Sequence, residues 1–350
     1  MPLPPQRMKR INVVRSRKVL IPFLIFILFI SLLFFYYEKN RVKSVGDVRL
    51  MLGTIVEITV LGVDQDELIL AMDAAFERMS RIEEVADRYT GESEIARLNR
   101  TAADGPVSVS SEMLEMLIMS ESLAERTEGA FDVTIAQLLD LWGFTGEPRL
   151  PAPEEIEVLL SSVCHSCVVV DEEHKTVYYT DPDIAVDLGG IAKGYAVDEA
   201  AEVLRSFGVE SGVINAGGDM AVIGKKGDAP WRIGIQHPRD SQELVAVLDV
   251  VDKSVVTSGD YERFFFSDDV RYHHIIDPHT GYPARLTMSV TVVADNTAVA
   301  DALATAYFVM GPEQAMETAE HADGIDILIV DADGTVTYTE GLSSIITLMQ

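Results

Sequence analysis

DLGGIAKG, at residues 187–194, is the stretch around which this chain is organised. The residues before it, 183–186, are typical of a strand, and residues 195–207, which precede Gly208, are typical of a helix. Paired glycines let a ligand approach the backbone closely, and a helix N-terminus offers N–H groups and partial positive charge. Lys193 adds a full charge, so the stretch predicts a phosphate or diphosphate site. The alternative interpretation is a tight strand-to-helix turn with a surface lysine.

The rest of the chain mixes strands with helices and shows no strict βαβ alternation. Alternation of residue types predicts a strand at 54–60 and hairpins at 168–180 and 325–339. Apolar residues three and four positions apart predict helices at 64–87 and 297–310. The pattern therefore predicts an α+β fold in which mixed sheets pack against helices.

The charge of the chain is divided unevenly along its length. The formal net charge is −28, yet the first roughly 45 residues are basic, so the rest of the chain is strongly acidic. An acidic body repels nucleic-acid phosphates, which argues against a nucleic-acid partner. It does not exclude one phosphate ligand held by a local cation.

The basic N-terminus precedes an apolar segment. Residues 1–18 carry six Lys or Arg, and residues 19–37 carry no charge over a length that crosses a bilayer as a helix. Positive residues ahead of such a helix predict a single-pass protein of the cell membrane whose body, residues 47–350, is extracytoplasmic. Residues 38–46 are predicted to be a linker. The alternative is a cleaved signal sequence, although no small-x-small cleavage site follows the apolar run.

The two cysteines form a single C-x-x-C motif, Cys164 and Cys167. One such motif supplies too few ligands for a four-coordinate zinc site. Outside the membrane the pair is compatible with a disulfide.

Asp301 and Thr305 are four residues apart in the predicted helix at 297–310 and share one helix face. The helix is otherwise mostly apolar, and a carboxylate buried in it needs a partner or a cation. Carboxylate and hydroxyl oxygens, with a backbone carbonyl from a glycine loop, suit Mg²⁺. The alternative is that Asp301 caps the helix or faces water.

His273 and His274 lie in a predicted strand and therefore point to opposite faces. One is expected to line a pocket, where it is a candidate general base or ligand contact, and the other is expected at the surface. The alternative is that both are ordinary polar strand residues.

Taken together, a series of short motifs over residues 50–340 resembles the ApbE-type FAD:protein FMN transferases, a family of flavin transferases. The motifs are Gly53-Thr54, Tyr89 with Ser93, residues 98–99, 129–132, 141–144, 187–194, 215–219, 257–261, 274–278 with Thr280-Gly281, and 300–305.

The resemblance implies a Mg²⁺-dependent transferase with an α+β fold and FAD between its two halves. Such enzymes split the diphosphate of FAD, release AMP and attach FMN through a phosphoester to a Thr or Ser of an acceptor flavoprotein, typically a subunit of a membrane redox complex. Two alternatives remain: an FAD pyrophosphatase that gives FMN and AMP, and a non-catalytic flavin-binding protein outside the membrane.

The resemblance also implies roles for individual residues. Asp301 and Thr305 side chains and the Gly190 carbonyl would hold Mg²⁺, and His274 would activate the acceptor hydroxyl beside the catalytic Asp301. Leu52 stands where the family commonly has Met. The FAD-binding residues would be Leu52, Tyr89, Ala130, Phe131, Asp132, Asp187, Lys193 and Ile275.

Overall fold

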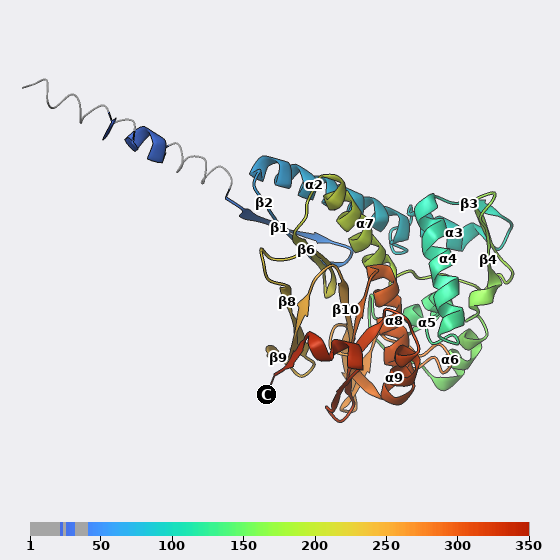
Figure 1. Cartoon of the computed structure of the whole chain (residues 1–350). Helices are drawn as coiled ribbons and strands as arrows, with labels where there is room; N and C mark the ends of the chain where they lie inside the picture. The colour runs from blue at the N-terminus through green and yellow to red at the C-terminus, as the bar shows by residue number, and fades with distance from the viewer. Residues whose placement is uncertain (1–21, 24–25, 32–40, 350) are drawn as a thin grey trace, which may run out of the picture.

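An eight-stranded sheet forms the centre of the computed structural model, which describes residues 22–23, 26–31 and 41–349 (Figure 1). In spatial order its strands are β1 (Lys43–Met51), β2 (Thr54–Gly62), β6 (Gly212–Ala216), β7 (Asp219–Ile223), β10 (Ser254–Gly259), β13 (Thr287–Ala294), β14 (Asp326–Asp331) and β15 (Val336–Tyr338). Each neighbouring pair is antiparallel. The predicted α+β class is confirmed, but the described strand pairs are antiparallel rather than mixed in direction.

Helices cover one face of this sheet, and a smaller sheet covers the other. The helices are α2 (Gln65–Ala86), α7 (Ala192–Ser206), α8 (Thr297–Met310) and α9 (Pro312–Glu320). The smaller sheet has the order β16 (Ile346–Leu348), β9 (Asp240–Val250), β8 (Trp231–His237). Because side chains alternate along a strand, Val292 of β13 packs in the helix-side core and Val293 packs in the core under the smaller sheet.

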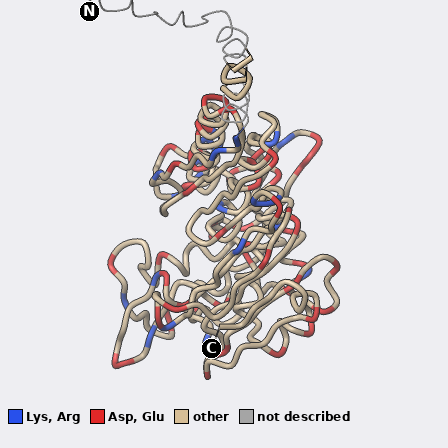
Figure 2. Tube along the Cα trace, turned by 60° about the vertical axis from the view of Figure 1, so that its left-hand side comes forward, with Lys and Arg blue, Asp and Glu red and all other residues tan. Residues whose placement is uncertain are grey.

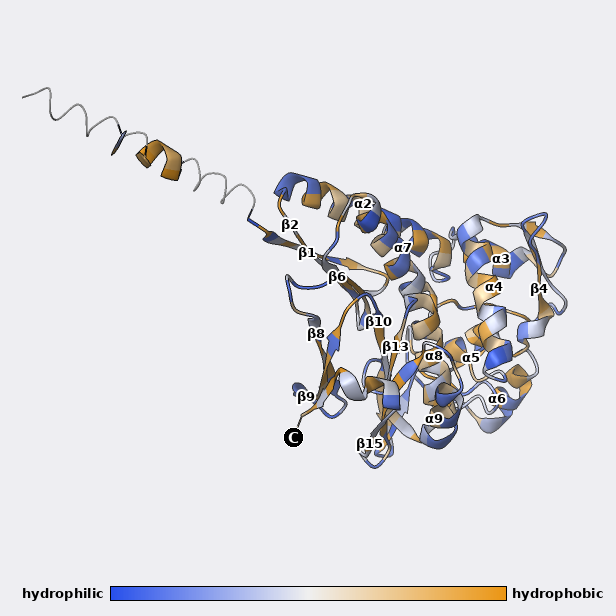
Figure 3. Cartoon of the chain, viewed as in Figure 1, coloured by the Kyte–Doolittle hydropathy of each residue, from blue (hydrophilic) through white to orange (hydrophobic). Residues whose placement is uncertain are grey.

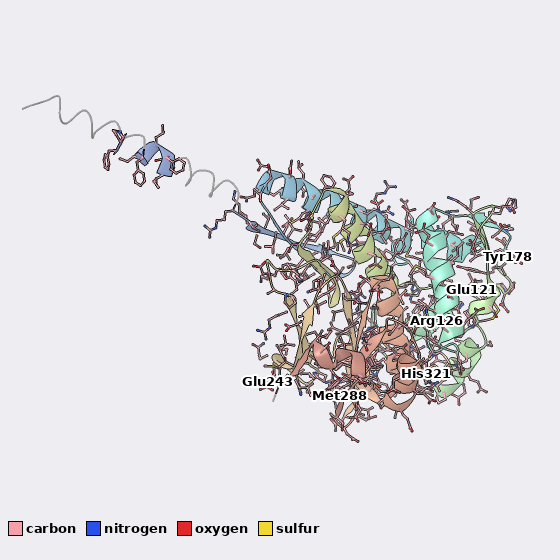
Figure 4. The ribbon with its side chains drawn as sticks, viewed as in Figure 1. Glu121, Arg126, Tyr178, Glu243, Met288 and His321 are labelled. Atoms are coloured by element: carbon pink, nitrogen blue, oxygen red, sulfur yellow. A yellow bond between two sulfur atoms is a disulfide. The ribbon has the colours of Figure 1, made fainter. Side chains whose placement is uncertain are left out.

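A helical region lies beside this layered body, on the right of Figure 1. It contains α3 (Glu94–Thr101), α4 (Ser111–Arg126), η1 (Val133–Ile135), α5 (Ala136–Trp142), α6 (Pro153–Leu160), η2 (His165–Cys167) and the small sheet of β3 (Val107–Ser108), β5 (Thr176–Tyr179) and β4 (Val168–Asp171). Contacts join α4 to α8. In Figure 4, Glu121 and Arg126 mark α4, and His321 marks the end of α9.

A two-residue turn joins β1 to β2. Met51 pairs with Thr54 across the turn, and Leu52 and Gly53 have φ values of 54° and 67°. Tight hairpins favour positive φ at both positions, but a leucine in that region costs roughly 1–2 kcal/mol. The Leu52 N–H donates to Glu83 Oε1 at 2.7 Å, and its side chain packs against the core. Leu52 is therefore held in a strained, fixed position at the tip of the hairpin.

Three local predictions fail. Residues 183–186 belong to no strand, because the side-chain amide of Asn99 bonds both the N–H and the C=O of Val186, at 2.9 Å each, in place of a partner strand. Strand β1 begins at Lys43, so residues 43–46 pair with β2 and are not linker. Residues 145–155 are rich in Pro, Gly and Glu, a composition that predicts a loop, but helix α6 begins at Pro153, and Pro at the start of a helix is well tolerated.

The predicted anchor at residues 19–37 lies mostly outside the described residues. Within it, residues 22–23 and 26–31 are helical, and Figure 3 shows that they are hydrophobic. Among the described residues, no helix combines the length and apolar character needed to cross a bilayer. The remaining described chain carries acidic positions throughout (Figure 2).

Candidate functional site

Helices α7 and α8 cross closely at the end of the 187–194 stretch. A Cβ on Gly194 would come 2.4 Å from the Thr297 carbonyl oxygen, so only glycine permits this approach. Asp198 of α7 accepts the N–H groups of Thr297 and Ala298 at 2.8 and 2.9 Å and so caps α8. The crossing brings the first turn of α7 against the side of α8 that carries Asp301.

Lys193, Asp219 and Asp301 form a cluster at this crossing. Asp219 and Asp301 are 2% and 3% exposed, and the side chain of Lys193 is 29% exposed. Lys193 Nζ lies 2.5 Å from Asp219 Oδ2 and 3.4 Å from each oxygen of Asp301. Asp301 Oδ2 also accepts the Gly194 N–H at 3.1 Å. The ammonium group of Lys193 thus connects the 187–194 stretch, the predicted diphosphate site, with Asp301, the predicted metal ligand.

The electrostatics of the cluster follow from its burial. Burial acts to lower the pKa of Lys193, but the charges of Asp219 and Asp301 outweigh it and raise that pKa, so the ammonium stays protonated. Burial, and then the nearby charge of Asp301, raise the pKa of Asp219. The site therefore contains two crowded acids and one cation, and a second cation would relieve the crowding.

The predicted metal ligands Gly190 and Thr305 lie close together, and Asp301 is one turn before Thr305 on α8. A Cβ on Gly190 would lie 3.7 Å from Thr305 Oγ1 and 3.1 Å from Phe131 Cε2, and Thr305 Oγ1 lies 3.5 Å from Ser258 Oγ. No cluster of three His, Cys, Asp or Glu capable of holding a metal occurs among the described residues. A carboxylate, a hydroxyl and a carbonyl are nevertheless the hard oxygen donors that Mg²⁺ prefers when substrate phosphates complete its shell. The residues present fit this ion.

Arg88, which sequence reasoning missed, joins two predicted FAD-binding residues, Asp187 and Tyr89. It donates to Asp187 Oδ2, to both oxygens of Asp140 and, at 2.8 Å, to the Tyr89 hydroxyl. Its guanidinium lies 4.3 Å from the centre of the Tyr89 ring. Burial acts to lower the pKa of Arg88, but bonds and charge from Asp140 and Asp187 raise it. Arg88 therefore fixes the carboxylate that opens the 187–194 stretch.

The residues before η1 have divided roles. Ala130 and Phe131 are both 4% exposed, and Phe131 contacts the position of Gly190. Asp132 is the N-cap of η1, since it accepts from Thr134 N at 2.8 Å and Thr134 Oγ1 at 2.6 Å. Its other oxygen accepts from His165 N at 3.1 Å. Both oxygens of its carboxylate thus accept hydrogen bonds from the chain itself.

The loop that Asp132 holds contains the disulfide. Cys164 and Cys167 form a disulfide with each other, which is the pairing that the sequence left open. The Cys164 N–H donates to Thr134 Oγ1 at 2.8 Å. Two backbone donors of the disulfide loop are therefore fixed to Asp132 and Thr134, which follow Phe131 in the chain.

His273 is buried and His274 is partly buried, so neither is the exposed surface histidine that the strand pattern predicts. Strand β12 (Val270–His273) pairs with β11 (Phe264–Ser267); His273 is its last residue and His274 follows it. His273 Nε2 bonds the Ala284 carbonyl at 2.7 Å, whereas His274 Nδ1 is buried without a partner among the described residues. Ile275, next in the chain, is 5% exposed. Of the two, His274 is the one with an unused ring nitrogen.

The protonation of the histidines leads to a stability prediction. Burial lowers the pKa of His273 to about 4, and burial with repulsion from Arg263 lowers that of His274 to about 3. In the unfolded chain histidine titrates near 6.5, so between pH of about 6.5 and 4 the unfolded state binds more protons. The free energy of unfolding should therefore decrease as the pH is lowered through this window, by up to about 1.4 kcal/mol per pH unit for each histidine.

The variant His273→Gln tests this directly, because glutamine can still donate to the Ala284 carbonyl but does not titrate. Urea unfolding at pH 7 and pH 5 should show a loss about 1–2 kcal/mol smaller in the variant than in the unaltered protein. Equal losses would mean that His273 is not held neutral.

Asp219 and Arg88 contact predicted site residues but were not among them. Asp219 follows two glycines at a strand end, the same pattern that singled out residues 187–194, so a signal for it was present. Arg88 stands beside Tyr89 in a polar loop, and nothing in its neighbours distinguished it from a surface arginine.

Comparison with known proteins identifies the family of the chain. A model of the ApbE family matches residues 52–329. The FAD:protein FMN transferase of Vibrio cholerae is 38% identical over 260 residues, which cover 71% of this chain and 76% of that protein. The FAD:protein FMN transferase of Treponema pallidum is 33% identical over 324 residues, or 87% and 89% of the two chains.

Solved structures give the same result. The crystal structure of an ApbE protein from Thermotoga maritima matches with a TM-score of 0.79 and 37% identity, over 85% of this chain and 98% of that one. The flavin transferase ApbE from Vibrio cholerae matches with a TM-score of 0.77 and 31% identity, over 87% and 100% of the two chains. The resemblance stated from the motifs is confirmed, and the chain belongs to the ApbE family.

Proposed function

We propose that the chain transfers FMN from FAD to a Thr or Ser hydroxyl of an acceptor protein, releases AMP and depends on Mg²⁺. As a member of the ApbE family it is a transferase, and its relatives carry the name FAD:protein FMN transferase. The observation that carries the proposal is the meeting of Lys193, Asp301, Thr305 and Gly190 at one helix crossing. Those groups suit a diphosphate and the cation that accompanies it.

The residues that would hold the ion are Asp301, Thr305 and Gly190, through a carboxylate oxygen, a hydroxyl and a carbonyl. When bound, Mg²⁺ offsets negative charge on the diphosphate and on the departing AMP. Asp301 Oδ1 is the available carboxylate oxygen, because its only hydrogen bond among the described residues comes from Lys193 Nζ at 3.4 Å, while Oδ2 also accepts the Gly194 N–H.

Lys193 supplies the fixed positive charge for the diphosphate. Several N–H groups of the 187–194 stretch are already used: that of Gly189 donates to Asp187 Oδ1, that of Ala192 to the Leu188 carbonyl, and that of Gly194 to Asp301. Binding of the anion therefore depends on the Lys193 ammonium more than the free helix N-terminus first suggested.

His274 is our candidate for accepting the proton of the acceptor hydroxyl. Its low pKa keeps the ring neutral at pH 7, and its Nδ1 has no partner among the described residues. The hydroxyl oxygen attacks the phosphorus of the FMN half of FAD and its proton passes to His274. The diphosphate P–O bond breaks, and AMP leaves with the bridging oxygen.

The FAD-binding set consists of Ala130, Phe131, Ile275, Leu52 and Tyr89, together with Asp187, Asp132 and Lys193. Phe131 contacts the position of Gly190 and supports the proposal most directly. Asp132 acts through the loop that it holds, since both of its oxygens already accept hydrogen bonds from the chain.

The experiment that tests the function mixes the purified protein with FAD, Mg²⁺ and a flavin-carrying subunit of a membrane redox complex. Fluorescent flavin that stays on the acceptor in a denaturing gel, with one AMP per flavin, is the expected result. AMP without a labelled acceptor would identify an FAD pyrophosphatase, and unchanged FAD would identify a flavin-binding protein without catalysis.

We also propose that residues 19–37 anchor the enzyme in the cell membrane, with its body, residues 47–350, on the extracytoplasmic side, close to acceptors in membrane redox complexes. The Cys164–Cys167 disulfide supports an oxidising compartment. Cell fractionation should find the intact chain in membranes and a variant without residues 1–38 in the soluble fraction. An intact chain that washes from membranes at high salt would contradict the anchor.

A further inference from the structure

We propose that Asp219 is a positioning residue that holds the Lys193 ammonium away from Asp301 and so leaves Asp301 open to the divalent cation. The inference rests on the proposed function, because it concerns the same cation site. It adds a residue that has no place among the metal ligands or the FAD-binding set described above.

The position of Asp219 is fixed by the turn before it. Gly217 and Gly218 have φ values of 62° and 101°, and the Gly218 N–H donates to Asn215 Oδ1 at 2.9 Å. A Cβ on Gly217 would come 2.4 Å from Thr54 Oγ1, so the turn packs directly on β2. Asp219 then begins β7, 2% exposed, and its carboxylate has little freedom to move.

The ammonium is shared unequally between the two acids. Lys193 Nζ lies 2.5 Å from Asp219 Oδ2 but 3.4 Å from both oxygens of Asp301. The shorter distance identifies Asp219 as the principal partner of the ammonium. Asp301 interacts with the ammonium charge only at this longer distance, so its Oδ1 remains available to another cation.

Loss of the Asp219 charge changes this balance. Asp301 would be the one carboxylate left within 4 Å of the ammonium among the described ion pairs. A lysine side chain is flexible, so Nζ would move to Asp301 and compete there with a divalent ion. Removing the ammonium as well should end the competition.

Titration of the free protein with Mn²⁺, followed by electron paramagnetic resonance in the absence of FAD, tests this without an activity assay. Asp219→Asn should raise the Kd for Mn²⁺ at least about tenfold, and the double variant Asp219→Asn with Lys193→Met should return it to within about threefold of the starting value. Asp219→Ser gives a second variant with the same expectation. Circular dichroism melts confirm that each variant is folded.

The matched control is Asp295→Asn, because Asp295 also pairs with a lysine, Lys253, at 2.5 Å but lies at the surface. It should leave Mn²⁺ binding unchanged. Unaltered affinity in Asp219→Asn would overturn the positioning role while leaving the proposed function intact. Weak binding that persists in the double variant would also overturn it, since Asp219 would then be a direct ligand. Failure of the unaltered protein to bind Mn²⁺ would reject both the metal role and this inference.

Discussion

Asp301→Asn is expected to lower kcat/KM for flavin transfer by about a thousandfold at saturating Mg²⁺. Asparagine keeps an oxygen that can accept the Gly194 N–H, which Asp301 accepts at 3.1 Å. It removes the charge that would hold the cation against the diphosphate. Because Lys193 retains Asp219 at 2.5 Å, the fold should survive, with a change in unfolding free energy within about 1 kcal/mol.

Release of AMP, measured by chromatography over a range of FAD concentrations, gives kcat and KM separately. Asp295→Asn, which removes a surface carboxylate, serves as the control and should keep full activity. A variant at position 301 that turns over FAD as fast as the unaltered protein would remove Asp301 from the metal site.

Lys193→Met is expected to impair both stability and function. In the absence of a divalent ion it leaves Asp219 and Asp301 buried without their shared cation. Removal of one partner from a fully buried ion pair costs about 3–5 kcal/mol, and the 29% exposure of the lysine side chain reduces this to about 2 kcal/mol. FAD binding should weaken at least about tenfold, because the fixed charge for the diphosphate is gone.

Urea unfolding and FAD fluorescence titration measure the two effects. Addition of Mg²⁺ should restore part of the lost stability, since the ion takes over the role of the ammonium. The double variant with Asp219→Asn should be more stable than Lys193→Met alone, because one buried charge fewer remains. A single variant as stable as the starting protein would mean that the two acids do not depend on Lys193.

The sequence predicted those features that depend on local pattern. The period of helix α8 placed Asp301 and Thr305 on one face, and glycine positions marked the turn before α7. Both signals arise within a few residues. The order of motifs along the chain then identified the family, which the comparisons confirm.

Features that depend on partners distant in sequence escaped prediction. Residues 183–186 look like a strand, but Asn99 takes the hydrogen bonds of Val186 from 87 positions away. Arg88 gains its place from Asp187, 99 residues away. Asp219 and Asp301 share the Lys193 ammonium because β7 and α8 contact each other, and no local pattern encodes that contact.

The most direct test of the central claim is a crystal structure of the protein with FAD and Mn²⁺, in which anomalous scattering locates the ion. The account predicts one anomalous peak, from an ion bound by the Asp301 carboxylate, the Thr305 hydroxyl and the Gly190 carbonyl. The FAD diphosphate should bind the same ion, with Lys193 beside it. An ion bound elsewhere, or FAD whose diphosphate lies away from these residues, would contradict the account.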